Sequence, residues 1–422
     1  MSRRRAAAPD GVNEYPRFTK QMRATHKLLV PQMAPIHFTM IVDVLRQKGY
    51  DVEILENDGP NVVHEGLQYV HNDACYPALL VIGQFIDALK SGRYDPDRVV
   101  LVISQTGGGC RASNYIHLLR KALLRAGFAQ VPVVSLNTSN LERSSGLRLT
   151  PDILIKAAAA CFFGDALMCL YNQVRPYEVC AGDADRLVAH WQERIISHFS
   201  RGRGRGTRLK KVFGEMARDF AKIPTKRTPK YKVGIVGEIY VKYSPLGNNN
   251  LEQFLIGEDC EINMPGLMGF VQYCIVNNIE TVNLYGGSRL KRWALQRALN
   301  YINRREGWLR AAVAAAGFAP PGRFERTREL SHRFIGKGTK MGEGWLLTGE
   351  MAELIESGFP NIICAQPFGC LPNHIAGRGM IPSLRRAYPA ANITPLDYDP
   401  SATRVNQENR IKLMLATAEK TL

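Results

Sequence analysis

The stretch VVLVISQTGGGCRASNYIHLLRKAL, residues 99–123, decides the fold class. Val99–Ile103 is a short apolar run of the kind that predicts a buried parallel strand. A glycine-rich loop follows, and a helical pattern then runs from about Arg111 to Ala126 and ends at Gly127. A strand, a glycine loop and a helix in this order indicate one unit of an α/β domain.

The same alternation of strand and helix patterns continues on both sides of this stretch. In the first half, strand patterns at 26–32, 51–56 and 131–137 alternate with helical patterns at 36–50, 76–94 and 151–172. A second series begins with a strand pattern at 231–241, continues through a turn-rich segment at 242–250, and ends in a helix from about Ser401. The sequence therefore predicts an α/β fold with two doubly wound parallel-sheet domains and additional helices.

Changes in composition along the chain predict four segments. Residues 1–17 are expected to form a flexible N-terminal tail, and residues 18–180 a first α/β domain that contains Cys75 and Cys110. Residues 181–230 are expected to be a helical segment with a basic loop and a proline-containing linker. Residues 231–422 are expected to be a second α/β domain that contains Cys370.

The bulk composition favours a globular protein of the cytoplasm. The chain has 422 residues, 45% of them hydrophobic, which is enough for two cores. No run of eighteen apolar residues is present, so no membrane span is expected, and the basic start lacks the apolar core of a secretory signal. Nine cysteines in a chain of this length do not form a disulfide scaffold and suggest a reducing compartment.

The formal net charge of +17 favours an anionic partner. Part of the excess lies in SRGRGRGTRLKK, residues 200–211, which contains no acidic residue. A nucleic-acid-binding arm is the less favoured interpretation, because no aromatic side chains interleave with the arginines to stack on bases. A solvated loop, or a basic rim for an acidic substrate or protein, stays open.

Three cysteines share one predicted setting, in which an extended segment precedes the cysteine and a helix follows it. They are Cys75, Cys110 and Cys370. In an open parallel sheet such positions gather at the carboxyl ends of the strands, and a helix N-terminus lowers the pKa of a thiol toward the thiolate that ligates iron or zinc. Cys364 is a possible further ligand.

Other interpretations of these cysteines remain open. Buried cysteines often serve as small hydrophobic residues, and a cysteine nucleophile would need a histidine base such as His117 or His374. No Walker loop or dinucleotide fingerprint is present at the glycines, so phosphate binding is not favoured. Several polar side chains near the cysteines or on the 242–250 loop could bind substrate, namely Gln105, Thr106, Ser244, Asn248, Asn373 and His374.

Six motifs in order along the chain resemble the 2-hydroxyacyl-CoA dehydratase superfamily. The nearest branch is the C-terminal portion of the acyl-CoA dehydratase activase-related proteins, and the resemblance extends from about Phe18 to Leu415. The motifs are NDACYPALLVIGQ (72–84), ISQTGGGCRASNYIHLLRKAL (103–123), RPYEV (175–179), VGIVGEIYVKYSPLGNNNLE (233–252), GEGWLLTGEM (342–351), and CAQPFGCLPNHIAGRGMIPSL with VNQENRIKLML (364–384 and 405–415).

This resemblance implies an oxygen-sensitive iron–sulfur protein of anaerobes with Rossmann- or flavodoxin-like domains. It implies that Cys75, Cys110 and Cys370 hold a 4Fe-4S cluster, to which an ATP-dependent activator protein delivers a low-potential electron. In the dehydratases of this superfamily the electron reaches the thioester carbonyl of a 2-hydroxyacyl-CoA, and the resulting ketyl radical expels the hydroxyl group. The implied activity is that of a hydro-lyase.

The resemblance also leaves a second activity open and implies partners. A sister branch carries a double-cubane cluster and reduces small molecules, so a reductase or an electron-transfer partner is the alternative. The long relatives carry ATPase segments and a related neighbouring region that this sequence lacks. We therefore expect a homologous cluster-binding subunit or a homo-oligomer, besides the activator and an acyl-CoA substrate.

Overall fold

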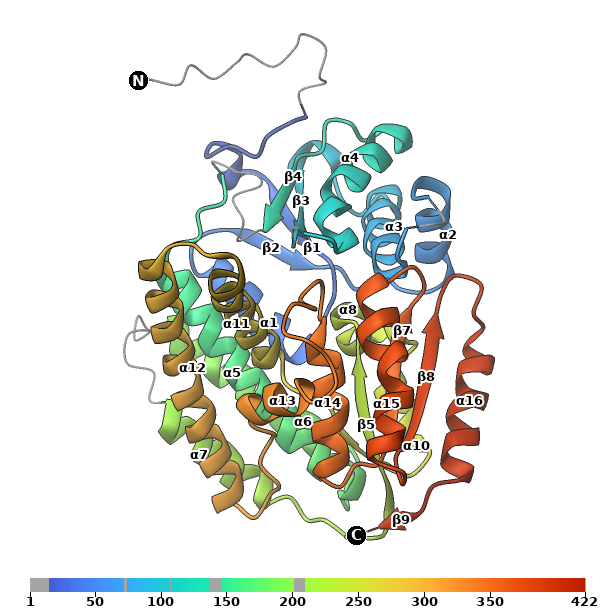
Figure 1. Cartoon of the computed structure of the whole chain (residues 1–422). Helices are drawn as coiled ribbons and strands as arrows, with labels where there is room; N and C mark the ends of the chain where they lie inside the picture. The colour runs from blue at the N-terminus through green and yellow to red at the C-terminus, as the bar shows by residue number, and fades with distance from the viewer. Residues whose placement is uncertain (1–14, 72–73, 107, 137–145, 201–208, 422) are drawn as a thin grey trace.

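The chain forms two parallel β-sheets with helices around and between them (Figure 1). The structure is a computed structural model, and it describes residues 15–71, 74–106, 108–136, 146–200 and 209–421. In the first sheet the strand order is β2-β1-β3-β4 and all pairs are parallel. Its strands are β1 (Lys27–Val30), β2 (Asp51–Ile54), β3 (Val99–Ser104) and β4 (Val133–Leu136).

The second sheet repeats this order as β6-β5-β7-β8, again with parallel neighbours. The prediction of two parallel-sheet α/β units is thus confirmed, and both units reverse their strand order beside the first strand. Its strands are β5 (Lys230–Gly237), β6 (Cys260–Asn263), β7 (Asn361–Pro367) and β8 (Asn392–Tyr398), with the short β9 (Lys420–Thr421) antiparallel to β5.

Helix α3 (Tyr76–Lys90) is the central helix of the first unit, and nearly all of its residues are buried. It contacts α2 (Pro60–Tyr69) so closely at Gly83 that a Cβ atom there would lie 2.1 Å from the carbonyl oxygen of Val62. The first unit also contains α1 (Pro35–Arg46) and α4 (Tyr115–Ala126).

The second unit differs from the sequence prediction just after its first strand. The predicted strand stops at Gly237, and the segment predicted as a turn forms two short helices, α8 (Ile239–Tyr243) and α9 (Pro245–Asn248). Glu238 and Ser244 accept backbone hydrogen bonds at the two helix starts, which is the capping that the prediction overlooked. The remaining helices around this sheet are α10 (Leu251–Gly257), α13 (Phe324–Ser331), α14 (Trp345–Glu356), α15 (Ile381–Ala387) and α16 (Arg404–Ala416).

A layer of long helices lies beside both sheets (Figure 1). It contains the two helices predicted within 181–230. Helices α5 (Pro151–Val174) and α12 (Arg289–Ala315) share the hydrophobic core of those two, so the layer includes residues outside that segment. Residues 1–14 of the predicted tail and 201–208 of the basic loop lie outside the described residues. The helices are α5 (Pro151–Val174), α6 (Asp183–Ser200), α7 (Leu209–Ala221), α11 (Leu267–Tyr285) and α12 (Arg289–Ala315).

Helix α5 is, within the described residues, the helix long and apolar enough to cross a membrane. Most of it is buried against its neighbours in the helical layer, including Trp191 and Phe213. Its apolar character is therefore that of a core helix.

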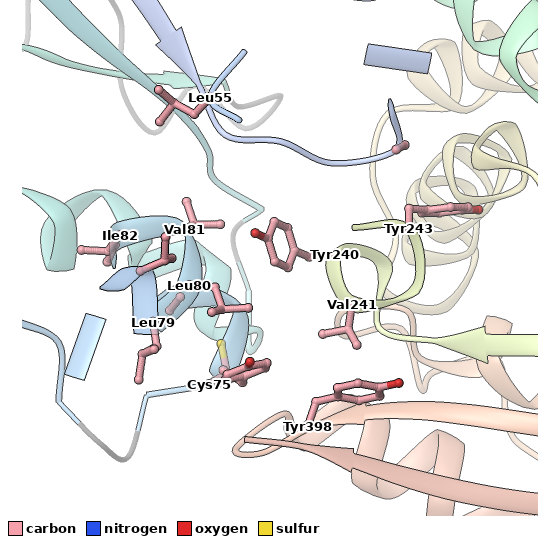
Figure 2. Packing of buried hydrophobic residues seen from close by; sticks show 14 of the residues in the cluster. Leu55, Cys75, Leu79, Leu80, Val81, Ile82, Tyr240, Val241, Tyr243 and Tyr398 are labelled. Carbon is pink, nitrogen blue, oxygen red and sulfur yellow. The ribbon is translucent and has the colours of Figure 1, made fainter. Parts of the chain in front are cut away.

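One hydrophobic cluster runs across the junction of the two units. Figure 2 shows Cys75, which directly precedes α3, and Leu80 of α3 on one side, and Tyr240, Val241 and Tyr398 of the second unit on the other. All five side chains belong to the same buried cluster. The start of α3 is thus held against the second unit by apolar packing.

Candidate metal centre

The three predicted cysteine ligands line a single small cavity at the junction of the two units. Cys75 and Cys110 come from the first unit and Cys370 from the second. Cys75 and Cys370 are buried, and Cys110 is partly exposed. The space open to a water-sized sphere is about 20 Å³, so the cavity is nearly filled by its own walls. The sequence prediction that these thiols lie close together therefore agrees with the structure.

Cys75 lies directly before α3, with an extended backbone and with Pro77 in the first turn of the helix. Its thiol lies 2.8 Å from the hydroxyl of Tyr115, which also lines the cavity. Cys75 differs from the other two in that no β-strand precedes it: helix α2 ends at Tyr69, and residues 72–73 of the predicted extended segment lie outside the described residues. It reaches the cavity through the packing of α3 against the second unit.

Cys110 ends the glycine loop that follows β3. The Ser113 backbone and hydroxyl both donate to the Cys110 carbonyl oxygen, at 3.1 and 2.6 Å, and fix the turn after the cysteine. Gly108 has a φ of +74°, a left-handed conformation that glycine adopts without strain. The N–H of Gly109 donates to the sulfur of Met341 at 3.2 Å, so the loop is also anchored to the second unit.

Cys370 ends the loop after β7 and precedes one turn of π-helix, Asn373–Gly377. The N–H of His374 donates to the Cys370 carbonyl oxygen at 3.1 Å. Gly369 also has a φ of +74°, and a Cβ atom at this position would lie 3.3 Å from the Cα of Cys75. The glycine before Cys370 thus permits the close approach of the two cysteine segments.

Two glutamates, which the sequence analysis did not identify, complete the acidic part of the cavity wall. Glu343 is 6% exposed and accepts a hydrogen bond from the Ile239 N–H at 3.1 Å. Glu238 follows β5 directly and accepts a hydrogen bond from the Val241 N–H at 2.9 Å. The signal in the sequence was the isolated acid between two glycines, Gly342-Glu343-Gly344. The burial of this turn is seen in the structure alone, and a buried acid is unusual.

The cavity wall strongly disfavours negative charge. Burial raises the pKa of Cys75 and of Cys370, and it raises the pKa of Cys110 to about 11, with Glu343 and Glu238 adding to the shift for Cys110 and Cys370. Burial and the neighbouring Glu343 raise the pKa of Glu238 to about 8. The prediction that helix N-termini lower these thiol pKa values was wrong, because desolvation outweighs the backbone hydrogen bonds that each thiol receives there.

The donor set fits a multinuclear centre better than a single ion. Among the described residues no three Cys, His, Asp or Glu side chains are grouped closely enough to chelate one metal ion. In an iron–sulfur cluster each thiolate binds a different iron, so the protein sulfurs stand farther apart than the ligands of one ion. The three thiols around this cavity would supply the anionic ligands that such a centre needs.

Cys364 does not belong to this cavity. It lies in β7 within a separate hydrophobic cluster, and its thiol lies 3.8 Å from the side-chain oxygen of Asn373. Its surroundings are those of a core cysteine, so the structure gives it no part in the cavity.

The six polar residues suggested as substrate contacts also lie outside the cavity wall. Gln105 bonds to the Ser113 backbone and to Ser135, and Asn373 bonds to the backbone of β7. Ser244 accepts a hydrogen bond from the Gly247 N–H within α9. Of the other three, Thr106 is exposed, Asn248 bonds to the α8 backbone, and His374 bonds to Gln366. A role of these residues in substrate binding stays a prediction.

Two larger cavities, of about 220 and 260 Å³, lie beside the helical layer and share no lining residue with the cysteine cavity. The smaller cysteine cavity is the better candidate for chemistry, because it gathers thiols and carboxyls whose like negative charges would repel one another. No protein-family model matches the chain, and no curated protein is significantly similar to it.

Proposed function

We propose that Cys75, Cys110 and Cys370 hold an iron–sulfur cluster of the 4Fe-4S type at the junction of the two units. The observation that carries this proposal is the meeting of three thiols from distant parts of the sequence in one buried cavity. The close approach of the Cys75 and Cys370 segments at Gly369 supports it, because it brings ligands of the two units to one place.

The resemblance described above then favours a subunit of an enzyme like the 2-hydroxyacyl-CoA dehydratases, a hydro-lyase. A bound cluster of this kind supplies one-electron transfer at low potential. The chain itself contributes three thiols, a nearly closed wall that excludes water, and the hydroxyl of Tyr115 beside Cys75. Hydrogen bonds to a ligating sulfur and the exclusion of water are two ways in which a protein tunes the potential of a cluster.

We expect a second chain to supply part of the substrate-binding site. The cavity, about 20 Å³, has no room for an acyl-CoA thioester, and the six polar candidates lie outside its wall. This supports the proposal of a homologous partner subunit or a second copy of the chain that completes the substrate site. The excess of positive charge would suit the phosphates of the CoA group.

A cytoplasmic setting and a separate ATP-dependent activator belong to the same proposal. All nine cysteines are free thiols, as expected in a reducing compartment. A fully active lone monomer in gel filtration would contradict the need for a partner.

The test is an iron and acid-labile sulfide analysis of protein purified without oxygen. About four irons per chain are expected, whereas about eight would indicate the double-cubane alternative. Absence of iron would overturn the proposal, and the cysteines would then be core residues. Conversion of 2-hydroxyacyl-CoA substrates in the presence of activator, ATP and reductant would separate a dehydratase from a reductase or an electron-transfer protein.

A further inference from the structure

The two α/β units are versions of one architecture, and they contribute to the cavity in matching ways. Beyond the common strand order, helix α3 and helix α14 each lead into the third strand of their sheet. The segments Gly83–Gly92 and Gly349–Gly358 have the same length and share glycine at the start and Ser-Gly at the end. Gly349 also contacts a neighbouring helix closely, as Gly83 does, since its Cβ would lie 2.5 Å from the Thr327 carbonyl oxygen.

At the cavity, the loop after the third strand of each unit contacts the other unit near the start of its matching helix. The loop after β3 meets the segment before α14, where Gly109 donates to the Met341 sulfur at 3.2 Å. The loop after β7 meets the segment before α3, where Tyr76 donates its N–H to the Phe368 carbonyl oxygen at 3.1 Å. Each unit therefore presents two segments to the cavity, one after its third strand and one before the preceding helix.

Three of these four segments carry a cysteine and the fourth carries Glu343. Cys110 and Cys370 follow the third strands, and Cys75 precedes α3. Cys75 and Met341 occupy matching positions, because each precedes its paired glycine, Gly83 or Gly349, by the same number of residues. Met341 is 44% exposed, however. The residue of its segment that lines the cavity is Glu343.

The backbone around Glu343 is built to direct this side chain inward. Gly342 and Gly344 have φ values of +56° and +44°, which other residues rarely adopt. A Cβ at Gly342 would lie 2.8 Å from Pro372 and 4.0 Å from the Cys110 sulfur, so this turn packs between the segments of Cys110 and Cys370. A buried carboxylate in such a turn is unfavourable by itself, and no basic side chain lies within ion-pair distance of it in the described parts of the chain.

We propose that the carboxylate of Glu343 is the fourth protein ligand of the cluster, on the iron that the three cysteines leave free. This inference rests on the proposed function, because it requires that a cluster is bound. It replaces Cys364, which lies in a separate core, and it gives each unit two ligands. A carboxylate is a harder and more weakly bound ligand for iron in a cluster than a thiolate, so this iron is the one that a substrate or a partner group could reach.

The experiment compares wild type with Glu343→Gln, Glu343→Cys and Glu238→Gln, all purified without oxygen and examined by iron analysis and by EPR before and after mild oxidation. In Glu343→Gln we expect the loss of about one iron per cluster on oxidation and the EPR signal of a three-iron form. In Glu343→Cys, which restores an anionic ligand, all four irons should remain. Glu238→Gln removes the other carboxylate that lines the cavity, which is half-buried, and should retain as many irons as wild type.

The outcomes separate this inference from the proposed function. A wild type without iron overturns both. A wild type with about four irons, together with a Glu343→Gln variant that keeps them all on oxidation, overturns the role of Glu343 and leaves the cysteine-bound cluster standing. Circular dichroism of each variant distinguishes loss of a ligand from loss of the fold, and Glu343→Cys serves where Glu343→Gln does not fold.

Discussion

The two α/β units share a strand order, yet they bury different polar groups at matching positions of their central helices. At the second position of the matching helix segments, the first unit has Gln84 and the second has Glu350. Gln84 is bonded to the backbone of Gln32 and Asn57, whereas Glu350 forms a buried ion pair with Lys242 at 3.2 Å. The difference shows that one topology accepts either a neutral amide or a charged pair at its centre, provided that each buried polar group has partners.

The two units should differ most in the stability lost when one member of their buried polar groups is removed, the Lys242–Glu350 ion pair or the hydrogen bonds of Gln84. Lys242→Met leaves Glu350 buried without its cation and should lower the free energy of unfolding by about 3–5 kcal/mol. Gln84→Met removes neutral hydrogen bonds and should cost about 1–3 kcal/mol. Urea denaturation measures both values.

The double variant Lys242→Met/Glu350→Gln is the control for the ion pair. It removes both charges and should recover most of the stability lost in Lys242→Met. An equal loss in Lys242→Met and Gln84→Met would show that the pair is not an energetically coupled, buried feature of the second unit.

The close helix contacts of the two units provide a second, smaller comparison. Gly83→Ala and Gly349→Ala should each destabilise the protein by about 1–3 kcal/mol, because backbone atoms leave no room for a methyl group. Gly83→Ala should cost more, since its Cβ would lie 2.1 Å from a carbonyl oxygen, against 2.5 Å at Gly349. Thermal unfolding of the two variants ranks them.

Gly307→Ala in α12 is the matched control, because no atom lies within 4 Å of its Cβ position. This substitution should stabilise the protein by about 0.5–1 kcal/mol through the helix propensity of alanine. If all three variants behaved alike, the matched glycines would not be contact points between helices.

Cross-strand ion pairs give the smallest expected effect. Lys27 of β1 pairs with Glu53 of β2 at the partly exposed edge of the first sheet, and Lys232 of β5 pairs with Glu261 of β6 in a more buried position. Lys27→Met should cost about 0.2–1 kcal/mol at neutral pH. Lys232→Met should cost more, because its partner is less solvated.

The pair at Lys27 should also depend on pH. Burial would raise the pKa of Glu53, but hydrogen bonds from Lys27 and Tyr94 outweigh it and lower the pKa below its ordinary value of 4.5. The stabilising contribution is therefore fully present above pH 4.5 and is lost as the pH falls through the lowered pKa. Melting temperatures of wild type and Lys27→Met should converge in acid, and a constant difference down to pH 2 would contradict the pairing.

Much of the fold follows from the sequence, because buried parallel strands appear as apolar runs and helices as amphipathic or apolar segments with end signals. The short α8 and α9 were missed, since their capping residues Glu238 and Ser244 resemble turn residues when read alone. The repeat of the two units was missed as well. The long α11 and α12 separate the matching segments of the second unit, and only the short Gly83 and Gly349 stretches are alike.

The candidate site was predictable only in part, for physical reasons. Cys110 and Cys370 follow parallel strands, so topology alone brings them to related positions. Cys75 follows a helix and reaches them through the tertiary packing of α3, which no local pattern records. Glu343 was missed because an acidic residue normally lies on the surface, and the burial of its turn follows from tertiary packing, which leaves the side chain 6% exposed.

The central claim is that three distant thiols act together on one metal centre, and the most direct measurement is iron content in matched cysteine variants. Cys110→Ala, Cys370→Ala and Cys364→Ala would be purified without oxygen and compared with wild type by iron analysis and EPR, with circular dichroism to verify the fold. We predict that Cys110→Ala and Cys370→Ala lose the cluster signal while they remain folded, and that Cys364→Ala retains it. Equal iron in all four proteins, or none in the wild type, would contradict the account.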